Sequence, residues 1–177
     1  MIKFRLNIYS MVILVAAILF GCGRTFMVDA KRYPVDQKMI PEFTSDNGIT
    51  LINVQKDQSA FLMGKQFDHK FNANLHQYTE IAIETLEGEL KNKNIAVEPN
   101  AEKKLRIAVT KVHFESRWGS GFLCDAFIQV NTGDGYTAEI DGHDTNAWVL
   151  YPCIYGALNH AVIAVLNDDK VTEYLKR

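Results

Sequence analysis

The chain has 177 residues, 47% of them apolar and 23% charged, and its 19 basic residues against 21 acidic ones give a formal net charge of −2. This composition is typical of a globular protein and excludes a disordered stalk. It also argues against nucleic acid as a partner, because that binding depends on clustered Lys and Arg that neutralise phosphates, and no basic block of five or more is present.

The first 21 residues have the pattern of a secretory signal peptide. Lys3 and Arg5 precede an unbroken apolar run, Met11 to Phe20. A helix that spans a bilayer needs roughly 20 apolar residues, about twice the length of this run. We therefore expect removal of the leader; 177 residues less 21 leaves 156, enough for one domain.

Leu19-Phe20-Gly21-Cys22 resembles the lipobox of bacterial lipoproteins, although that motif usually has a smaller side chain than Phe20. The resemblance implies cleavage before Cys22 and acylation of Cys22, which would hold the protein on a membrane surface without spanning it. Gly23 stands where many inner-membrane lipoproteins have Asp. By the same resemblance this implies the outer membrane, with the domain facing the periplasm. The alternative is an ordinary cleaved signal or a short anchor.

Residues 22–47 show no sustained periodicity and contain two prolines, so we expect a lipidated tether there and a folded domain over residues 48–177. The β-branched run 49–54 predicts a first strand. Residues 60–64 are either a second strand or an inserted loop. Apolar residues at three- and four-residue spacing predict a helix over 72–94, with Asn72 or Asn74 as its N-cap.

Alternating apolar residues predict three further strands, over 105–115, 122–131 and 136–143, which form an antiparallel meander. In the first of these strands the apolar residues move from odd-numbered to even-numbered positions after Lys111, which indicates a bulge near Thr110 to Val112 or burial on both faces. Residues 153–167 then predict a second long helix, with a short one after Asp168 and Asp169. The fold class expected is α+β: an antiparallel sheet of about four strands covered on one face by two helices, in a two-layer sandwich.

The order of these elements resembles that of YajG-like small envelope lipoproteins, which are loosely akin to auxiliary lipoproteins of envelope transport systems. The matching segments are Leu86-Glu87-Gly88-Glu89-Leu90, Ile95-Ala96-Val97, Lys104 to Val109, and Ala161 to Leu175. All are packing patterns, so the resemblance implies no reaction and no cofactor. The segment Ala60 to Phe71 is longer than this family usually has.

The chain has three cysteines. If Cys22 is lipidated, Cys124 and Cys153 remain as a pair in an oxidising compartment. The two residues either form a disulfide or remain buried thiols, and the sequence leaves both open.

The candidates for chemistry are few. Asp141, His143 and Asp144 fall in an expected turn where they could converge on a metal ion or act in acid–base catalysis. No nucleophile elbow, phosphate loop, dinucleotide fingerprint or paired-Cys zinc motif is present. Aromatic residues at the strand ends form either core or a groove for a ligand or partner, the groove residues being Trp118, Phe122, Trp148 and Tyr151.

These observations favour a non-catalytic, membrane-anchored lipoprotein that binds another envelope component, either protein or lipid. The alternative is an envelope hydrolase or metal-binding protein that uses the Asp141-His143-Asp144 turn.

Overall fold

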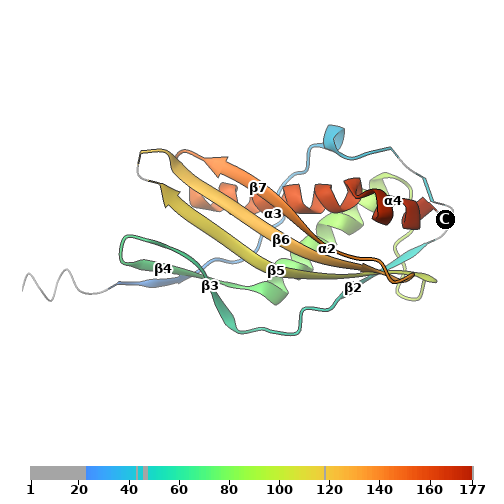
Figure 1. Cartoon of the computed structure of the whole chain (residues 1–177), viewed down its shortest axis with the longest axis horizontal. Helices are drawn as coiled ribbons and strands as arrows, with labels where there is room; N and C mark the ends of the chain where they lie inside the picture. Colours follow the sequence, from blue (N-terminus) through green and yellow to red (C-terminus); the bar gives the residue numbers. More distant parts are fainter. Residues whose placement is uncertain (1–22, 43, 46–47, 118, 177) are drawn as a thin grey trace, which may run out of the picture.

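The long strands and helices of the domain run side by side and give it an elongated shape, with the first described residues and the C-terminal helix at opposite ends (Figure 1). The computed structural model describes residues 23–42, 44–45, 48–117 and 119–176. Its elements are β1 (Thr25–Met27), the 3₁₀ helix η1 (Gln37–Met39), β2 (Ile49–Asn53), β3 (Ala60–Gln66), β4 (His69–Asn74), α2 (Leu75–Asn92), β5 (Lys103–Arg117), β6 (Gly121–Thr132), β7 (Thr137–Asn146), α3 (Leu150–Asn167) and α4 (Asp169–Lys176).

The larger sheet has four strands in the order β2-β5-β6-β7. Strands β5, β6 and β7 form the predicted antiparallel meander, and the α+β class is confirmed. The first strand differs from the prediction, because β2 lies parallel to β5. A parallel pair needs a crossover connection, and the segment from β3 through α2 supplies it.

A second sheet of three strands, in the order β1-β4-β3, was not predicted. Residues 60–66 are a strand, which settles the alternative left open for residues 60–64. The helix begins at Leu75, later than predicted, because residues 69–74 belong to β4; Asn74 is its N-cap and accepts a hydrogen bond from the Gln77 N–H (3.2 Å). The two sheets are joined where His113 Nδ1 of β5 donates to the Met63 carbonyl oxygen of β3 (2.7 Å).

The expected tether is part of the packed domain over much of its length. Residues 25–27 form β1, which pairs in parallel with β4. Val28 and Ile40 are buried in the core, and Asn159 of α3 donates to the Tyr33 carbonyl oxygen (2.9 Å). The tether prediction is therefore wrong for this part of the chain. Proline-containing extended backbone can be held by side chains of other elements without any periodicity of its own.

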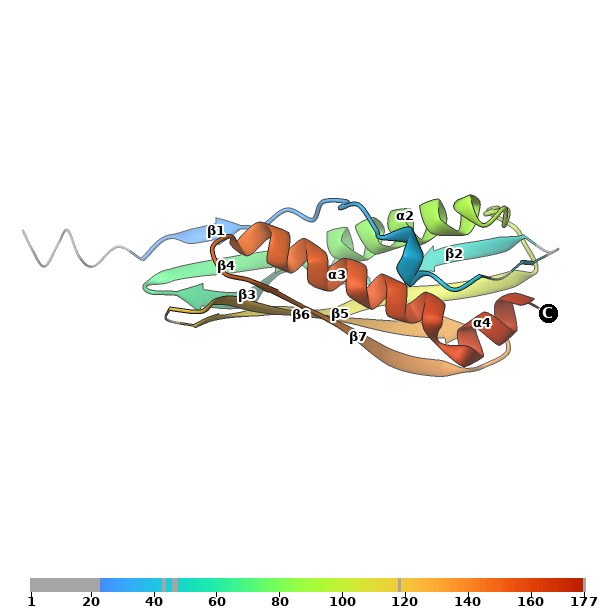
Figure 2. The same cartoon turned by 90° about the horizontal axis from the view of Figure 1, so that it is seen from above.

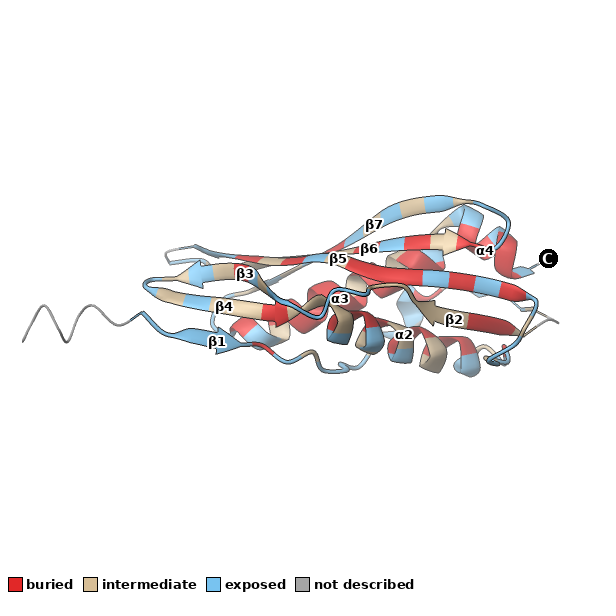
Figure 3. Cartoon of the chain, turned by 90° about the horizontal axis from the view of Figure 1, so that it is seen from below, coloured by how far each residue is buried: buried red, intermediate tan, exposed pale blue. Residues whose placement is uncertain are grey.

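Helices α2 and α3 cover the same face of the four-stranded sheet (Figure 2). The buried positions of the sheet and the helices face one another and form one core (Figure 3). Helix α3 is long and apolar enough to cross a membrane, but 72% of its 18 residues are buried inside the domain. It is therefore the central core helix, and its apolar side chains pack on β6 and β7.

The predicted bulge is present, as a register shift between Val109 and Lys111 of β5. At this level β2 has ended, and the last backbone hydrogen bond from this segment to β5 is the Val54 N–H donating to the Ile107 carbonyl oxygen (3.0 Å). The Val109 N–H instead donates to the hydroxyl of Thr79 on α2 (2.9 Å). A helix side chain thus takes over the hydrogen bond that a neighbouring strand would have made.

Helix α3 approaches β7 most closely at Gly142. A Cβ atom at this position would lie 2.0 Å from the Ala161 backbone nitrogen and 2.4 Å from the Ala157 carbonyl oxygen. Only glycine allows the two backbones to be this close.

Candidate functional site

The residues predicted as a catalytic or metal-binding turn lie instead within strand β7. Because successive side chains on a strand point to opposite faces, Asp141 and His143 face solvent while Asp144 faces α3. Asp144 lies against Gly156 of that helix, where an added Cβ would be 1.7 Å from its Oδ2 atom. The three residues therefore do not converge on one point.

A different third residue joins His143 on the open face of the sheet. Asp125 of β6 is directly opposite His143, and the ring Nδ1 donates to Asp125 Oδ1 (2.6 Å), while Nε2 lies 2.5 Å from Asp141 Oδ2. The hydrogen bond to Asp125, followed by the contact with Asp141, raises the pKa of His143 above its usual value. Both carboxylates stabilise the protonated ring.

The surroundings of His143 are open to solvent, and both of its ring nitrogens have carboxylate partners. The His143 side chain is 60% exposed, so water competes with any ligand of the ring. Both ring nitrogens already face carboxylates, which leaves neither nitrogen free to bind a metal ion or a substrate proton. Among the described residues, no group of three or more His, Cys, Asp or Glu side chains is placed to hold a metal ion.

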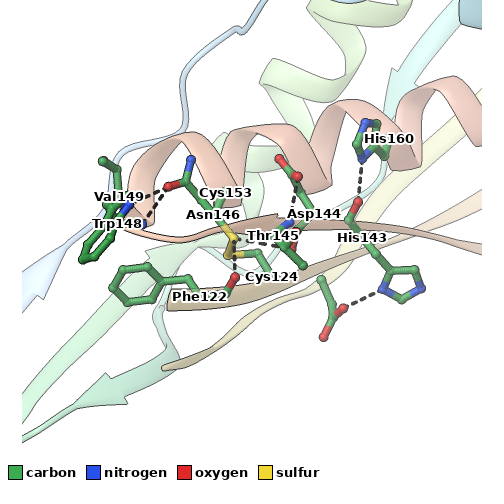
Figure 4. The surroundings of a disulfide bond; sticks show 11 residues. Phe122, Cys124, His143, Asp144, Thr145, Asn146, Trp148, Val149, Cys153 and His160 are labelled. Carbon is green, nitrogen blue, oxygen red and sulfur yellow. Dashed lines mark hydrogen bonds and ion pairs between the residues drawn. A yellow bond between two sulfur atoms is a disulfide. The ribbon is translucent and has the colours of Figure 1, made fainter. Parts of the chain in front are cut away.

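Cys124 of β6 and Cys153 of α3 form a disulfide in the structure, with their Cα atoms 5.8 Å apart (Figure 4). Both residues are fully buried, so the bond joins the first turns of α3 to the sheet from inside the core. Asn146 holds the preceding loop, since its Oδ1 atom accepts hydrogen bonds from the Trp148 N–H (3.0 Å) and the Val149 N–H (2.9 Å). The start of α3 and the Trp148 loop are therefore fixed to the sheet.

An aromatic surface lies at the N-terminal end of the domain. The ends of β3 and β5, the start of β6 and the loop before α3 surround an open cavity of about 460 Å³. Two of the predicted groove residues line this cavity: Phe122, which is almost buried, and Trp148, whose exposed fraction is 88%. We call this cavity and its rim the tip surface; its lining residues are Gln66, Phe67, Ser116, Arg117, Gly119, Gly121, Phe122, Ala147 and Trp148.

The other two predicted groove residues have different outcomes. Tyr151 does not line the tip surface and instead borders a separate cavity with Asp29 and Tyr155. Trp118 lies outside the described residues, although Arg117 and Gly119 on either side of it line the tip surface.

Phe67 is a tip residue that the sequence did not reveal. Gln66 and His69 pair across the β3–β4 hairpin, so Phe67 and Asp68 form a two-residue turn. Phe67 has a φ of +52°, in the left-handed region that Gly or Asn usually occupies in such turns. Its side chain is 80% exposed. A bulky apolar residue is thus held in an unfavourable backbone conformation with its ring in solvent.

A run of aromatic contacts connects this end of the domain to the core. Phe26 of β1 stacks on Phe71 (ring centroids 5.3 Å apart), Phe71 meets Phe114 edge to face (5.4 Å), and Phe114 meets Phe122 (6.0 Å). Such pairs hold rings in fixed relative orientations. The aromatic residues behind the tip surface are therefore part of the packed structure.

The start of the described chain lies beside this surface. An added Cβ at Gly23 would be 2.3 Å from the Asp68 carbonyl oxygen, and the Lys70 N–H donates to the Arg24 carbonyl oxygen (2.9 Å). Cys22, the predicted lipidation site, and the predicted signal peptide fall outside the described residues. Gly23 is the next residue after Cys22, so the position of Gly23 limits where an anchor at Cys22 can attach.

The fold and this site define the class of the chain as an α+β domain that carries an open aromatic surface beside its N-terminal strand. Comparison with solved structures shows a similar fold in protein XCC0632 from Xanthomonas campestris, of the DUF330 family. Its crystal structure has a TM-score of 0.51 at 8% sequence identity, covering 84% of this chain and 94% of that one.

A second crystal structure, of an uncharacterized protein, has a TM-score of 0.41 at 9% identity, covering 83% of this chain and 96% of the other. No protein-family model and no curated protein matches the sequence. At these identities the similarity to the DUF330 protein establishes a shared fold only.

Proposed function

We propose that the protein is a lipoprotein, anchored by acylated Cys22 and facing the periplasm, that acts as a non-catalytic binding or assembly component of the bacterial envelope. The observation that carries this proposal is the position of Gly23, the residue that follows Cys22. Gly23 contacts Asp68 in the β3–β4 turn, next to the exposed ring of Phe67. An anchor one residue earlier would attach directly at the tip surface.

The sequence and the fold support this proposal in two further ways. The pair that remains when Cys22 is acylated forms a disulfide, which is typical of proteins outside the cytoplasm. The fold is also that of a DUF330 protein, which adds a structural relative but no activity.

The competing proposal is an envelope hydrolase or metal-binding protein that uses Asp141, His143 and Asp144. It is weakened because these three residues are divided between the two faces of β7. The Asp125–His143–Asp141 group that replaces them lies open to water on the outer face of the sheet. Catalytic acids and bases usually act in a site that excludes water. We therefore propose a function in binding.

Metabolic labelling with a radioactive fatty acid tests the anchor. We expect label on the wild-type protein, none on the Cys22→Ala variant, and recovery of the wild type with the outer-membrane fraction. Absence of label from the wild type, in cells that acylate a known lipoprotein, would refute the proposal. Affinity capture of the lipidated protein, with the Cys22→Ala form as the matched control, would then identify the envelope partner.

A further inference from the structure

The structure points to the phospholipid bilayer itself as the ligand of the tip surface. We propose that the Phe67 and Trp148 side chains insert into the interfacial region of the membrane that carries the anchor, so that the domain stands on its tip. This inference rests on the proposed acylation of Cys22, and it goes further by assigning the membrane contact to particular side chains.

The first argument is the chemistry of the exposed side chains. Phe67 and Trp148 are 80% and 88% exposed, and they come from separate loops that line the same cavity. Trp is enriched where proteins meet the membrane interface, because its ring is apolar and its N–H finds partners among the headgroups. Phe supplies apolar area alone, and its transfer from water is favourable.

The second argument is the conformation of Phe67. Its positive φ is disfavoured for a residue with a bulky side chain, and the turn would form more readily with Asn or Gly. The stability of the isolated domain therefore does not account for Phe at this position. Burial of the ring in a bilayer accounts for it, since the gain is realised only when the protein is on the membrane.

The third argument is the length of chain between the anchor and the tip. Consecutive Cα atoms are about 3.8 Å apart, so an acylated Cys22 would lie within one residue of Gly23, which packs against Asp68. No flexible spacer separates the proposed anchor from the turn that presents Phe67. Acyl chains inserted in the membrane would hold the tip surface at the level of the headgroups.

The charges around the turn fit an anionic lipid surface. Arg24, Lys65 and Lys70 are exposed beside the turn, against the single carboxylate of Asp68. The more distant Arg117 pairs with Glu115 (3.5 Å). Basic residues at a membrane surface are attracted to anionic headgroups.

The same geometry disfavours a second copy as the occupant. Two copies anchored in one bilayer would both point their tips toward the lipid. Contact between two tips would require each copy to lift its tip from the membrane, against the pull of its own acyl chains. Lipid is the partner that the anchor brings to this surface.

The test measures the depth of Trp148 in vesicles. The chain has two tryptophans, so Trp118→Phe leaves Trp148 as the only one, and its emission can be excited separately from that of the tyrosines. The lipidated protein is reconstituted into vesicles that contain anionic phospholipid, with or without bromine on the acyl chains near the headgroups, and acylation is measured by mass on the same sample. We expect brominated lipid to quench Trp148 and the vesicle to protect it from aqueous iodide.

The decisive variant is Phe67→Asn, which removes the ring and suits the left-handed turn, so the domain stays folded and its Tm stays equal or rises. Loss of the ring is expected to lower the ratio of inserted to free tip by about tenfold. The matched control is Met39→Asn, which removes an exposed apolar side chain from η1, away from the tip, and is expected to leave quenching unchanged.

The outcomes separate this inference from the proposed function. Acylated protein whose Trp148 is quenched by iodide and not by brominated lipid would overturn the insertion of the tip while leaving the anchor intact. A shift in emission that depends on protein concentration, without quenching by brominated lipid, would show self-association and also overturn it. If no acyl chain is found, the proposed function fails. Vesicles that contain brominated lipid are then added to the unacylated protein. Quenching of Trp148 supports insertion of the tip surface, and absence of quenching refutes it.

Discussion

Breaking the disulfide between Cys124 and Cys153 provides a quantitative test of how α3 is held to the sheet. The two residues are 29 positions apart, and the segment between them includes most of β6 and all of β7. A cross-link that closes a loop of this length lowers the entropy of the unfolded chain by about 12 cal/mol/K, which corresponds to about 3.6 kcal/mol of stability at 25 °C.

Urea unfolding followed by circular dichroism measures this effect. With a slope of about 2 kcal/mol per molar urea, the unfolding midpoint should fall by about 1.8 M when the bond is reduced. The unfolding midpoint of the Cys124→Ala/Cys153→Ala variant should fall by at least as much, because the substitutions also leave small cavities in the core. Equal midpoints for oxidised and reduced wild type, or alkylation of Cys124 and Cys153 when the protein is unfolded without a reductant, would refute the reasoning.

Two further predictions concern contacts between the helices and the sheet, and a third concerns His143 on the open face of the sheet. Thr79→Val should cost about 1–3 kcal/mol in urea unfolding, because the buried Val109 N–H loses its acceptor. Gly142→Ala should lower stability by roughly 3 kcal/mol, because α3 must move away from β7. His143 has a raised pKa in the folded state, so its contribution to stability should be full below the unfolded pKa of about 6.5 and be lost as the pH rises through the folded value.

The first two predictions have control variants, and the third is tested with a variant of His143. Thr85 is equally buried, but its hydroxyl only donates to the Ile81 carbonyl oxygen of its own helix, so Thr85→Val should cost less than Thr79→Val. Gly48→Ala places its Cβ no closer than 3.4 Å to a neighbour and should change stability little. His143→Gln should flatten the pH dependence above the unfolded pKa of about 6.5; an unchanged profile would mean that the contacts with Asp125 and Asp141 do not stabilise the fold.

The meander and the long helices were predictable because each carries its own apolar period. The parity shift in β5 even located the bulge, since one extra residue moves every later side chain to the other face. The second sheet lacked such a signal. β1 has three residues, all exposed, and β4 reads His-Lys-Phe-Asn-Ala-Asn, so only pairing with distant partners makes them strands.

The candidate site was less predictable, because it depends on which loops meet. Asp125 could have been placed opposite His143 by counting back along β6 and β7 from their shared turn, since Asn131 pairs with Thr137 and the register continues without a shift. Phe67 offered no comparable signal. Phe is unusual at a left-handed turn position, and its approach to Trp148 depends on the packing of one sheet against the other.

The parallel pairing of β1 with β4 has a mechanical consequence. β1 lies at the tip end of the domain, roughly parallel to its long axis (Figure 2), and the backbone hydrogen bonds to β4 extend from Arg24 to Val28. A force applied at Gly23 and directed away from the domain would act along this strand and load all of these bonds at once in shear, where an antiparallel terminal hairpin would unzip one bond at a time. This strand of three residues is thus well oriented to bear tension.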